Sequence, residues 1–478
     1  MGRRVATGAG FQFLGLALRT VLTIGSTAVL ARLLLPADFG YIAMATVVTE
    51  FAALFGAFGF TNVLIQRRVI NRVQLDTVFW ATLAVGLVLS LAVFLLSFAA
   101  GWLFADPAVG PILRFLCLNF VLSSLTAVPW VVMARLMRFR TEFWINIGTV
   151  IVRIAAAVGC ALAGLGMWSL VVGALVGALT SAVLGFINVP YRPRWRFQWT
   201  LISSTWRTSG SYFGGSVMYY LNTSVDLLLI GRQLGPTPLG YYQNARSLTD
   251  EIRARIATPI QHVLFPAFSA LQSERERFQQ LVIRAGRLLA AVVIPVGVGV
   301  SANATNLVLV LYGEPWRPMI PVMAMFGISA AVRASTAIAT PLFNAHDRVS
   351  LALRYNVLGT LLLIVGVYFA LPWGIDGVAV AMAGASFYAL VPLRRAFALI
   401  DLSARDMTSV LGPPTLASTV MWLVIEGLAR WDGLTSPALG LFAHVVAGAL
   451  TYLLALHLIS RRYLQDLLQV RALFKRQS

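Results

Sequence analysis

The chain has little charge and almost no lysine. Charged residues make up 12% of its 478 residues, whereas soluble domains carry about 25%. Arginine supplies all but one of the 37 basic residues, and the exception is Lys475. With no other lysine, the rest of the chain cannot hold a P-loop, a Schiff-base lysine or a lysine general base.

Cysteine and histidine are also scarce. The two cysteines, Cys117 and Cys160, lie in apolar stretches without a CxxC pair, and we interpret them as small apolar residues. The four histidines are widely separated, so the sequence predicts no metal site. GxSxG, HExxH and Walker A motifs are absent, and no polar segment is long enough for a catalytic domain. We therefore expect no cofactor and no enzymatic activity.

Hydrophobic residues are abundant instead. They form 59% of the chain, and the mean hydropathy is +0.80. A membrane-spanning helix needs about 20 apolar residues. The sequence predicts an all-α integral membrane protein with fourteen spans, the first of which is too long to be a signal peptide. They lie at about 7–34, 40–65, 77–104, 109–133, 143–163, 167–189, 206–231, 239–268, 285–312, 319–343, 352–372, 377–399, 409–429 and 437–460.

The joins between spans alternate in charge. If the N-terminus is cytoplasmic, the inner segments hold 26 of the 37 basic residues and the outer joins hold four. Basic residues accumulate on the cytoplasmic side of membrane proteins. The pattern predicts that both termini are cytoplasmic, and it explains the net charge of +19 without a nucleic acid partner.

The chain contains an internal repeat. Residues 31–50 align without gaps to residues 231–250, and Glu50 faces Asp250. The repeat joins span 1 to span 2 in one half and span 7 to span 8 in the other, so we predict two six-helix lobes that are parallel repeats. The identical pairs are Arg32/Arg232, Leu34/Leu234, Pro36/Pro236, Gly40/Gly240, Tyr41/Tyr241, Ala45/Ala245 and Thr49/Thr249.

These repeats define the predicted organisation. The lobes cover 1–189 and 206–400, with a cytoplasmic join at 190–205. Two further spans occupy 401–460. The basic tail, 461–478, is either an amphipathic helix on the inner membrane surface or an extension of the last span.

Five segments carry a resemblance to a known family. They are 31–45, 59–68, 75–80, 226–242 and 264–272. They resemble the polysaccharide transporter family of the multidrug/oligosaccharidyl-lipid/polysaccharide exporter superfamily, which includes lipopolysaccharide, colanic-acid and succinoglycan flippases. The resemblance implies two lobes in a V around a central cavity that opens alternately to each side.

The resemblance also implies a cargo, namely a polyprenyl-diphosphate-linked oligosaccharide. The lipid II branch of the superfamily has several arginines in its first span. Here only Arg19 lies mid-span, with Arg32 at the far end, which argues against lipid II. We expect a flippase of the bacterial inner membrane that contacts membrane lipids and works beside a polysaccharide polymerase and glycosyltransferases.

Two other functional classes fit the sequence less well. A drug or organic-cation antiporter of the same superfamily would favour an acidic and aromatic cavity, but seven arginines face five acids at membrane depth. A membrane glycosyltransferase or polymerase would need a catalytic domain or a long outer loop.

Charged residues inside a membrane are functional candidates, because burying them is costly unless they are paired or face water. The eighth predicted span is the richest in charge and cannot face lipid. Arg246, Asp250 and Arg253 share one helical face, and Glu251 and Arg255 form an i,i+4 pair. The segment is either a set of neutralised pairs or a cavity wall with one spare positive charge for an anionic cargo.

The other intramembrane charges are more isolated. Arg19 and Glu50 either pair with each other, or bind the cargo diphosphate and respond to protons or cations, respectively. Arg153 and Arg333 are lone mid-span charges that bind either phosphate or backbone carbonyls. Arg32, Arg232 and Asp226 lie near the outer ends, which favours a role in anchoring the helices at the interface. Asp226 is also a candidate for coupling or ion pairing, as are Asp250 and Glu251.

Arginine suits a diphosphate because its planar group donates two parallel hydrogen bonds and stays charged. The candidate diphosphate ligands are Arg19, Arg153, Arg246, Arg253, Arg255 and Arg333. A sugar needs aromatic and amide groups, for which the candidates are Tyr219, Asn222, Tyr242 and Asn244. The tyrosines equally fit the aromatic belt found at membrane interfaces.

Overall fold

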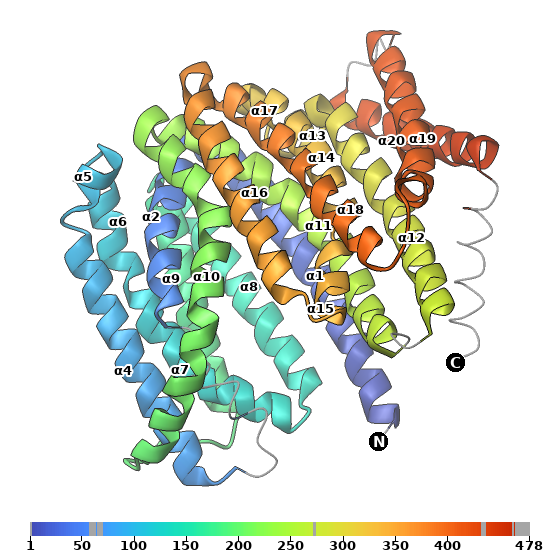
Figure 1. Ribbon diagram of the computed structural model, residues 1–478. Helices are drawn as coiled ribbons and strands as arrows, with labels where there is room; N and C mark the ends of the chain where they lie inside the picture. Colours follow the sequence, from blue (N-terminus) through green and yellow to red (C-terminus); the bar gives the residue numbers. More distant parts are fainter. Residues whose placement is uncertain are drawn as a thin grey trace. The chain divides into compact units, whose positions relative to one another are not determined.

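The computed structural model describes residues 2–56, 64, 70–270, 274–431, 436–460 and 463. All regular structure in these residues is helical (Figure 1). The chain divides into two compact units, Met1–Gly240 and Tyr241–Ser478. The predicted lobe boundary lies earlier, at 190–205, but α10 packs on α2 and α4 and so belongs to the first unit. The lobe boundaries stay a prediction.

Each unit is built from long helices joined by short connections. The first contains α1 (Gly2–Leu33), α2 (Pro36–Leu54), α4 (Arg72–Leu96), α5 (Ala100–Phe104), α6 (Val109–Leu116), α7 (Leu118–Arg135), α8 (Phe139–Leu162), α9 (Trp168–Asn188) and α10 (Trp199–Leu234). Helix α11 (Pro236–Ala270) begins at the end of the first unit and continues into the second. The second unit also contains α12 (Arg275–Ala302), α13 (Ala304–Leu311), η1 (Glu314–Met319), α14 (Ile320–Ser335), α15 (Ala339–Ala345), α16 (Val349–Ala370), η2 (Leu371–Trp373), α17 (Gly374–Ser386), η3 (Phe387–Ala389), α18 (Leu390–Leu399), α19 (Ala404–Trp431) and α20 (Pro437–Ile459).

Local sequence signals set several helix boundaries. Helix α2 starts with Pro36, and the carboxylate of Asp38 accepts a hydrogen bond from the backbone N–H of Leu35 (2.9 Å). At the start of α4, Asn71 and Gln74 bond to each other's backbone N–H groups, which is a capping box. These interactions replace the hydrogen bonds that the first turn of a helix lacks.

The helices account for the predicted spans, although their exact number is not established. Among the described residues, 10 helical segments are long and apolar enough to cross a membrane, and one of these, Val349–Leu399, covers two predicted spans. The other three predicted spans correspond to α1, α10 and α11. Charged and amide residues lower the mean hydropathy of α10 and α11. The count of fourteen stays a prediction.

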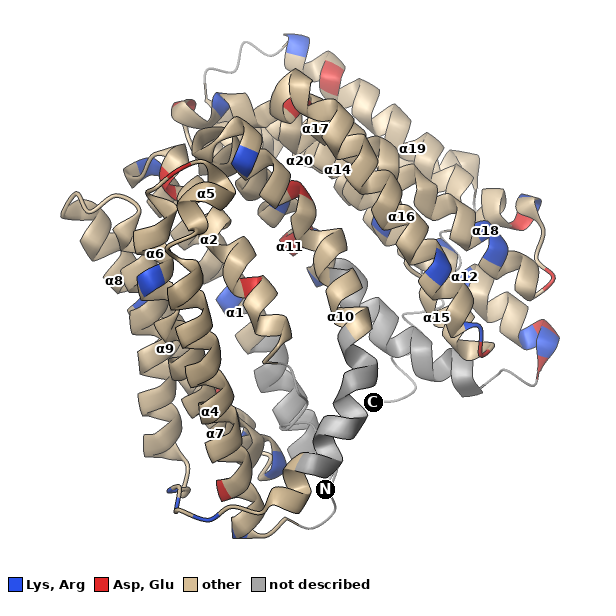
Figure 2. Ribbon diagram, turned by 60° about the vertical axis from the view of Figure 1, so that its left-hand side comes forward, with Lys and Arg blue, Asp and Glu red and all other residues tan. Residues whose placement is uncertain are grey.

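Contacts within each unit group the joins as the arginine pattern predicts. In the first unit, the inner joins meet where Arg138 bonds to the carbonyl of Asn188 (3.2 Å) and Tyr191 to Asp76 (3.0 Å). Two outer joins meet where Tyr41 bonds to Asp106 (3.0 Å). In the second unit, Arg275 at the start of α12 pairs with Asp401 after α18, joining two inner segments. In Figure 2, charged residues gather at helix ends and connections.

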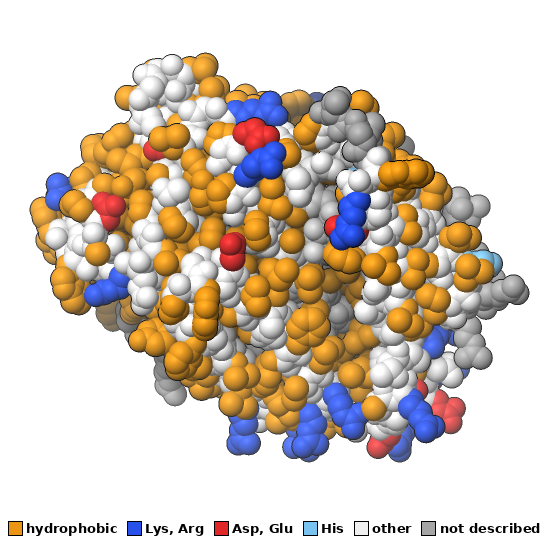
Figure 3. Space-filling view, turned by 90° about the horizontal axis from the view of Figure 1, so that it is seen from above, with side chains coloured by type: hydrophobic (Ala, Val, Ile, Leu, Met, Phe, Trp, Pro, Cys, Tyr) orange, Lys and Arg blue, Asp and Glu red, His pale blue; other side chains and the backbone are white. Residues whose placement is uncertain are grey.

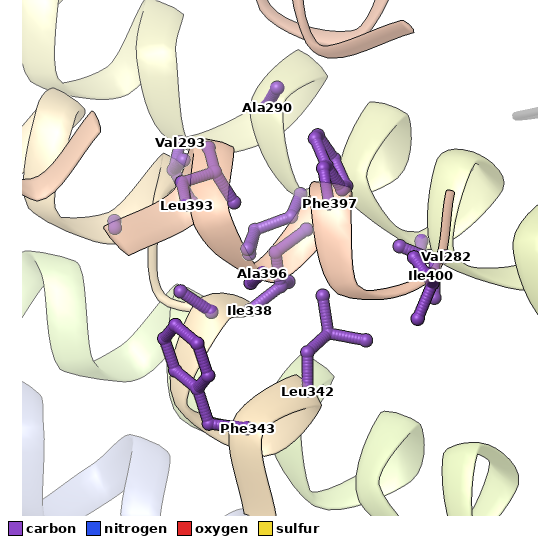
Figure 4. Packing of buried hydrophobic residues seen from close by; sticks show 14 of the residues in the cluster. Val282, Ala290, Val293, Ile338, Leu342, Phe343, Leu393, Ala396, Phe397 and Ile400 are labelled. Carbon is purple, nitrogen blue, oxygen red and sulfur yellow. The ribbon is translucent and has the colours of Figure 1, made fainter. Parts of the chain in front are cut away.

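Apolar side chains cover the helices outside as well as inside. The largest described core cluster, in the second unit, joins α12, α15 and α18 through residues such as Val293, Phe343 and Phe397 (Figure 4). Leu450 of α20 and Val88 of α4 are instead more than 60% exposed, and orange side chains cover much of the face in Figure 3. Apolar patches this large indicate contact with lipid rather than with water.

The two copies of the internal repeat cross at their glycines. A Cβ on Gly40 would lie 1.8 Å from the carbonyl oxygen of Pro236, and a Cβ on Gly240 would lie 1.9 Å from that of Pro36. The contacts are reciprocal, so each repeat presents its glycine to the first turn of the other. Only glycine permits backbones to approach this closely.

Candidate functional site

Two of the predicted diphosphate ligands, Arg19 and Arg153, lie on α1 and α8, which pack against each other in the first unit. Arg19 of α1 lines a pocket with Glu142, Phe143 and Asn146 of α8. It is close enough to Arg153 for their like charges to repel. Two neighbouring guanidinium groups are a candidate site for an anion, because an anion would relieve this repulsion.

Helix packing fixes the position of Arg153. Its aliphatic stem lies against Gly177 of α9, where an added Cβ would come within 3.1–3.3 Å of three side-chain carbons of Arg153. A larger residue at 177 would therefore displace the stem. Nothing in the sequence indicated this contact, since Gly177 is one of several glycines in an apolar helix.

Glu142 and Asn146 are pocket residues that the sequence interpretation missed. They lie in the first two turns of α8, which the hydropathy pattern divided between an inner join and the start of a span. Glu142 leaves the group of Arg19, Arg153 and Glu142 with one net positive charge. The sequence signal that could have identified this pair is its spacing of four residues, which puts Glu142 and Asn146 on one face of a helix.

Glu50 lies at a polar contact between α2 and α10. The hydroxyl of Ser224 donates to its carboxylate (3.3 Å), and Tyr220 Oη donates to the carbonyl of Val47 one turn earlier (2.9 Å). Glu50 is exposed. The structure therefore places Glu50 beside α10 and Arg19 beside α8.

Other predicted residues of α10 lie in different surroundings. Asp226 is 0% exposed and is thus fully buried. Asn222 is half-buried. The side chain of Tyr219 lies outside the part of the chain that the structure describes. Arg232 donates to the carbonyl of Leu103 (3.2 Å) and lies over the Trp102 ring, which fits the predicted anchoring role.

Helix α11 carries the predicted charge pairs of the second unit. Asp250 lies between two arginines, 3.7 Å from Arg246 and 3.1 Å from Arg253. Arg255 pairs with Glu251. The Arg246 side chain is 8% exposed, and the other four are between 29% and 39% exposed. Three arginines and two acids leave this cluster with one net positive charge.

A second pocket lies beside this cluster. Thr249, Ile252 and Arg253 of α11 line it together with α12 and α14. Its other lining residues are apolar or glycine: Val293, Val296, Gly297, Val300, Gly327, Ala330 and Ala334. Arg253 thus bonds to Asp250 and also borders a small apolar cleft.

The remaining candidates of the second unit are more enclosed. Tyr242 is fully buried and packs edge-to-face on Phe326 (5.1 Å between centroids). Asn244 is also buried, and Arg333 of α14 is half-buried. No group of three His, Cys, Asp or Glu side chains suited to a metal occurs among the described residues.

Comparison with known families identifies the chain. The family model described as "Polysaccharide biosynthesis protein" matches residues 29–321, more than half of the sequence. The chain belongs to this family. The resemblance carried by the repeat motifs is therefore confirmed.

Curated relatives are named for polysaccharide biosynthesis. The chain is 27% identical over 358 residues to the lipopolysaccharide biosynthesis protein WzxC of Escherichia coli K12, covering 73% of this chain and 72% of that protein. It is 28% identical over 305 residues to the succinoglycan biosynthesis transport protein ExoT of Rhizobium meliloti, covering 64% and 62%.

Solved structures share the fold. The lipid II flippase MurJ in an inward closed conformation matches with a TM-score of 0.72 at 15% identity, covering 95% of this chain and 99% of that one. An inward-facing multidrug transporter of the MATE family gives 0.60 at 13% identity, covering 82% and 96%. The protein is therefore an all-α, multi-pass membrane protein that shares the fold of these transporters, as the sequence predicts.

Proposed function

We propose that this protein is a flippase that moves polyprenyl-diphosphate-linked oligosaccharide repeat units across a bacterial inner membrane. The product would enter lipopolysaccharide or exopolysaccharide. The names of the relatives support the pathway, since one is a lipopolysaccharide and another a succinoglycan biosynthesis protein. The fold shared with a lipid II flippase supports a lipid-linked cargo.

The excess of arginine in both units is the observation that carries this proposal. Arg19 and Arg153 neighbour each other with Glu142, and three arginines of α11 accompany two acids. Together the two clusters hold five arginines and three acids, and the diphosphate is the part of the cargo that arginines would bind. Charge-assisted hydrogen bonds from arginine to phosphate are among the strongest in proteins.

The acidic residues take a different role in this proposal. Asp250 and Glu251 orient the arginines of α11, because each holds a guanidinium group from its own helix. Glu50 is the candidate for coupling to protons or cations, since its carboxylate is exposed and bonded to Ser224. Arg333 stays a candidate ligand, and Asn222, Tyr242 and Asn244 stay candidates for sugar contact.

A drug or organic-cation antiporter is the alternative. The exposed Glu50 favours it, because a cation site needs a carboxylate, and the fold occurs in multidrug transporters. The spare positive charge beside each pocket opposes it. The two functions differ in the sign of the charge they transport.

The test is transport in vesicles. The purified protein would be reconstituted in liposomes with a short-chain polyprenyl-diphosphate oligosaccharide, and movement between leaflets would be followed by accessibility to a glycan-modifying enzyme. We expect faster movement of the lipid-linked sugar and no uptake of a fluorescent organic cation under a proton gradient. Cation uptake without sugar movement would favour the antiporter.

The proposal also places the protein in the cell. Both termini face the cytoplasm, where the basic joins lie, and the cargo passes from glycosyltransferases on that side to a polymerase on the other. Cysteines introduced at positions 140, 194 and 277 should resist an impermeant thiol reagent in intact cells. Labelling of any of them from outside would contradict this topology.

A further inference from the structure

The segment between α9 and α10 is fixed to the start of α4. Tyr191 is buried and donates to the Asp76 carboxylate (3.0 Å), which also accepts from the backbone N–H of Arg194 (3.3 Å). The indole N–H of Trp80 donates to the Arg194 carbonyl (2.9 Å). The segment is therefore an ordered part of the first unit.

Large aromatic side chains project from this ordered segment. Trp195 stacks on Trp80 at 4.0 Å between centroids, yet it is 86% exposed. Phe197 is 53% exposed, and Trp199 at the start of α10 is 69% exposed. Three exposed aromatic rings on a fixed backbone indicate a binding partner with an apolar surface.

Exposed arginines alternate with these aromatics in the order Arg194, Trp195, Arg196, Phe197. Arg192, in contrast, donates to carbonyls at the end of α9, including that of Phe186 (2.7 Å). No carboxylate pairs with the Arg194 or Arg196 side chain in the part of the chain that the structure describes. Both guanidinium groups are thus available to an anionic partner.

We propose that residues 194–199 bind the surface of an anionic phospholipid leaflet. Trp195, Phe197 and Trp199 enter the boundary between headgroups and acyl chains, where amphipathic rings are most stable. Arg194 and Arg196 bind lipid phosphates. This lipid site is separate from the proposed cargo site, because its residues come from a surface connection and not from the charged faces of α1, α8 and α11.

A membrane surface fits these features better than the cargo does. The cargo carries only one diphosphate, and the arginines proposed to bind it lie on α1, α8 and α11 rather than on this connection. A leaflet offers many phosphates above an apolar layer, and aromatic and cationic side chains that share one short segment match both layers. Because the segment is bonded to α4 and leads into α10, lipid binding there would anchor both helix ends.

The test uses the full-length protein in detergent, titrated with phosphatidylglycerol or phosphatidylcholine and read by native mass spectrometry. The double variant Arg194→Gln/Arg196→Gln should lose about 30-fold in affinity for phosphatidylglycerol, since each arginine near an anionic surface contributes about fivefold. Arg394→Gln/Arg395→Gln removes the same charge from exposed positions on α18 that lack neighbouring tryptophans, and it should lose clearly less affinity than the first double variant.

Two further measurements complete the test. Phe197→Ser should weaken phosphatidylglycerol binding while Tyr191, which fixes the segment, remains in place. A titration with farnesyl diphosphate, a soluble analogue of the cargo lipid, separates lipid from cargo. Equal losses in both arginine double variants would overturn the proposal. So would loss of farnesyl diphosphate binding with phosphatidylglycerol binding intact. Failure of sugar transport would leave this result unaffected.

Discussion

The crossing of the two repeats gives the sharpest prediction, the effect of Gly40→Ala. The new methyl group would lie 1.8 Å from the carbonyl oxygen of Pro236, 2.5 Å from its carbonyl carbon and 2.9 Å from its Cα. Ordinary contacts begin at 3.4 Å. All three neighbours are backbone atoms, so no side chain can rotate away and the helix ends must move apart.

We expect this movement to lower the free energy of unfolding by about 1–3 kcal/mol, the usual cost of overpacking. Gly240→Ala should act alike, because its Cβ would lie 1.9 Å from the Pro36 carbonyl oxygen. The double variant should cost less than the sum of the single ones, since the first substitution already opens the contact that the second disturbs.

The measurement is thermal unfolding of purified protein in detergent, with Gly159→Ala as the matched control. Gly159 lies within α8, and a Cβ there would meet nothing within 4 Å, so the control should be neutral or stabilising by about 0.4–1 kcal/mol. If Gly40→Ala unfolded like Gly159→Ala, the reciprocal crossing would be refuted. Additive costs in the double variant would show that the two glycines act independently.

Three further predictions follow from the other contacts. Arg246→Ala should reduce polymer export roughly ten- to a hundredfold at an unchanged level of folded protein, because it loses a charge-assisted hydrogen bond of about 1.5–3 kcal/mol. Normal export by the double variant Arg246→Ala/Asp250→Asn would instead show that Arg246 serves only as the partner of Asp250. Gly177→Ala should reduce export by displacing the Arg153 stem, whereas Gly159→Ala should not, and equal export by both would contradict a role for Arg153. Burial and the hydrogen bond to Asp76 raise the pKa of Tyr191 above its ordinary value. The folded state therefore holds this proton longer than the unfolded state. Above pH 10 the free energy of unfolding of the wild type should therefore fall by up to about 1.4 kcal/mol per pH unit more than that of Tyr191→Phe. The measurement is unfolding at alkaline pH, and the same pH dependence in both proteins would contradict this prediction.

The class of protein and the alternation of its joins could be predicted from the sequence alone. Apolar runs of about 20 residues can satisfy their backbone in lipid only as helices, so hydropathy was enough to predict an all-α membrane fold. The alternation of arginine predicted which joins share an end, and contacts such as Tyr191 with Asp76 agree with it. The repeat and its neighbouring motifs were specific enough to indicate the family.

The sequence also indicated the pairs on α11, because residues three and four apart on a helix are neighbours whatever surrounds them. It could not place Arg19 beside α8, Glu50 beside Ser224, or the stem of Arg153 against Gly177. These contacts join helices far apart in the chain, and the rotation of a helix about its axis decides them. Hydropathy records that rotation poorly in a membrane protein, because the lipid-facing and buried sides of a helix are both apolar. Only tertiary packing decided which charges became neighbours.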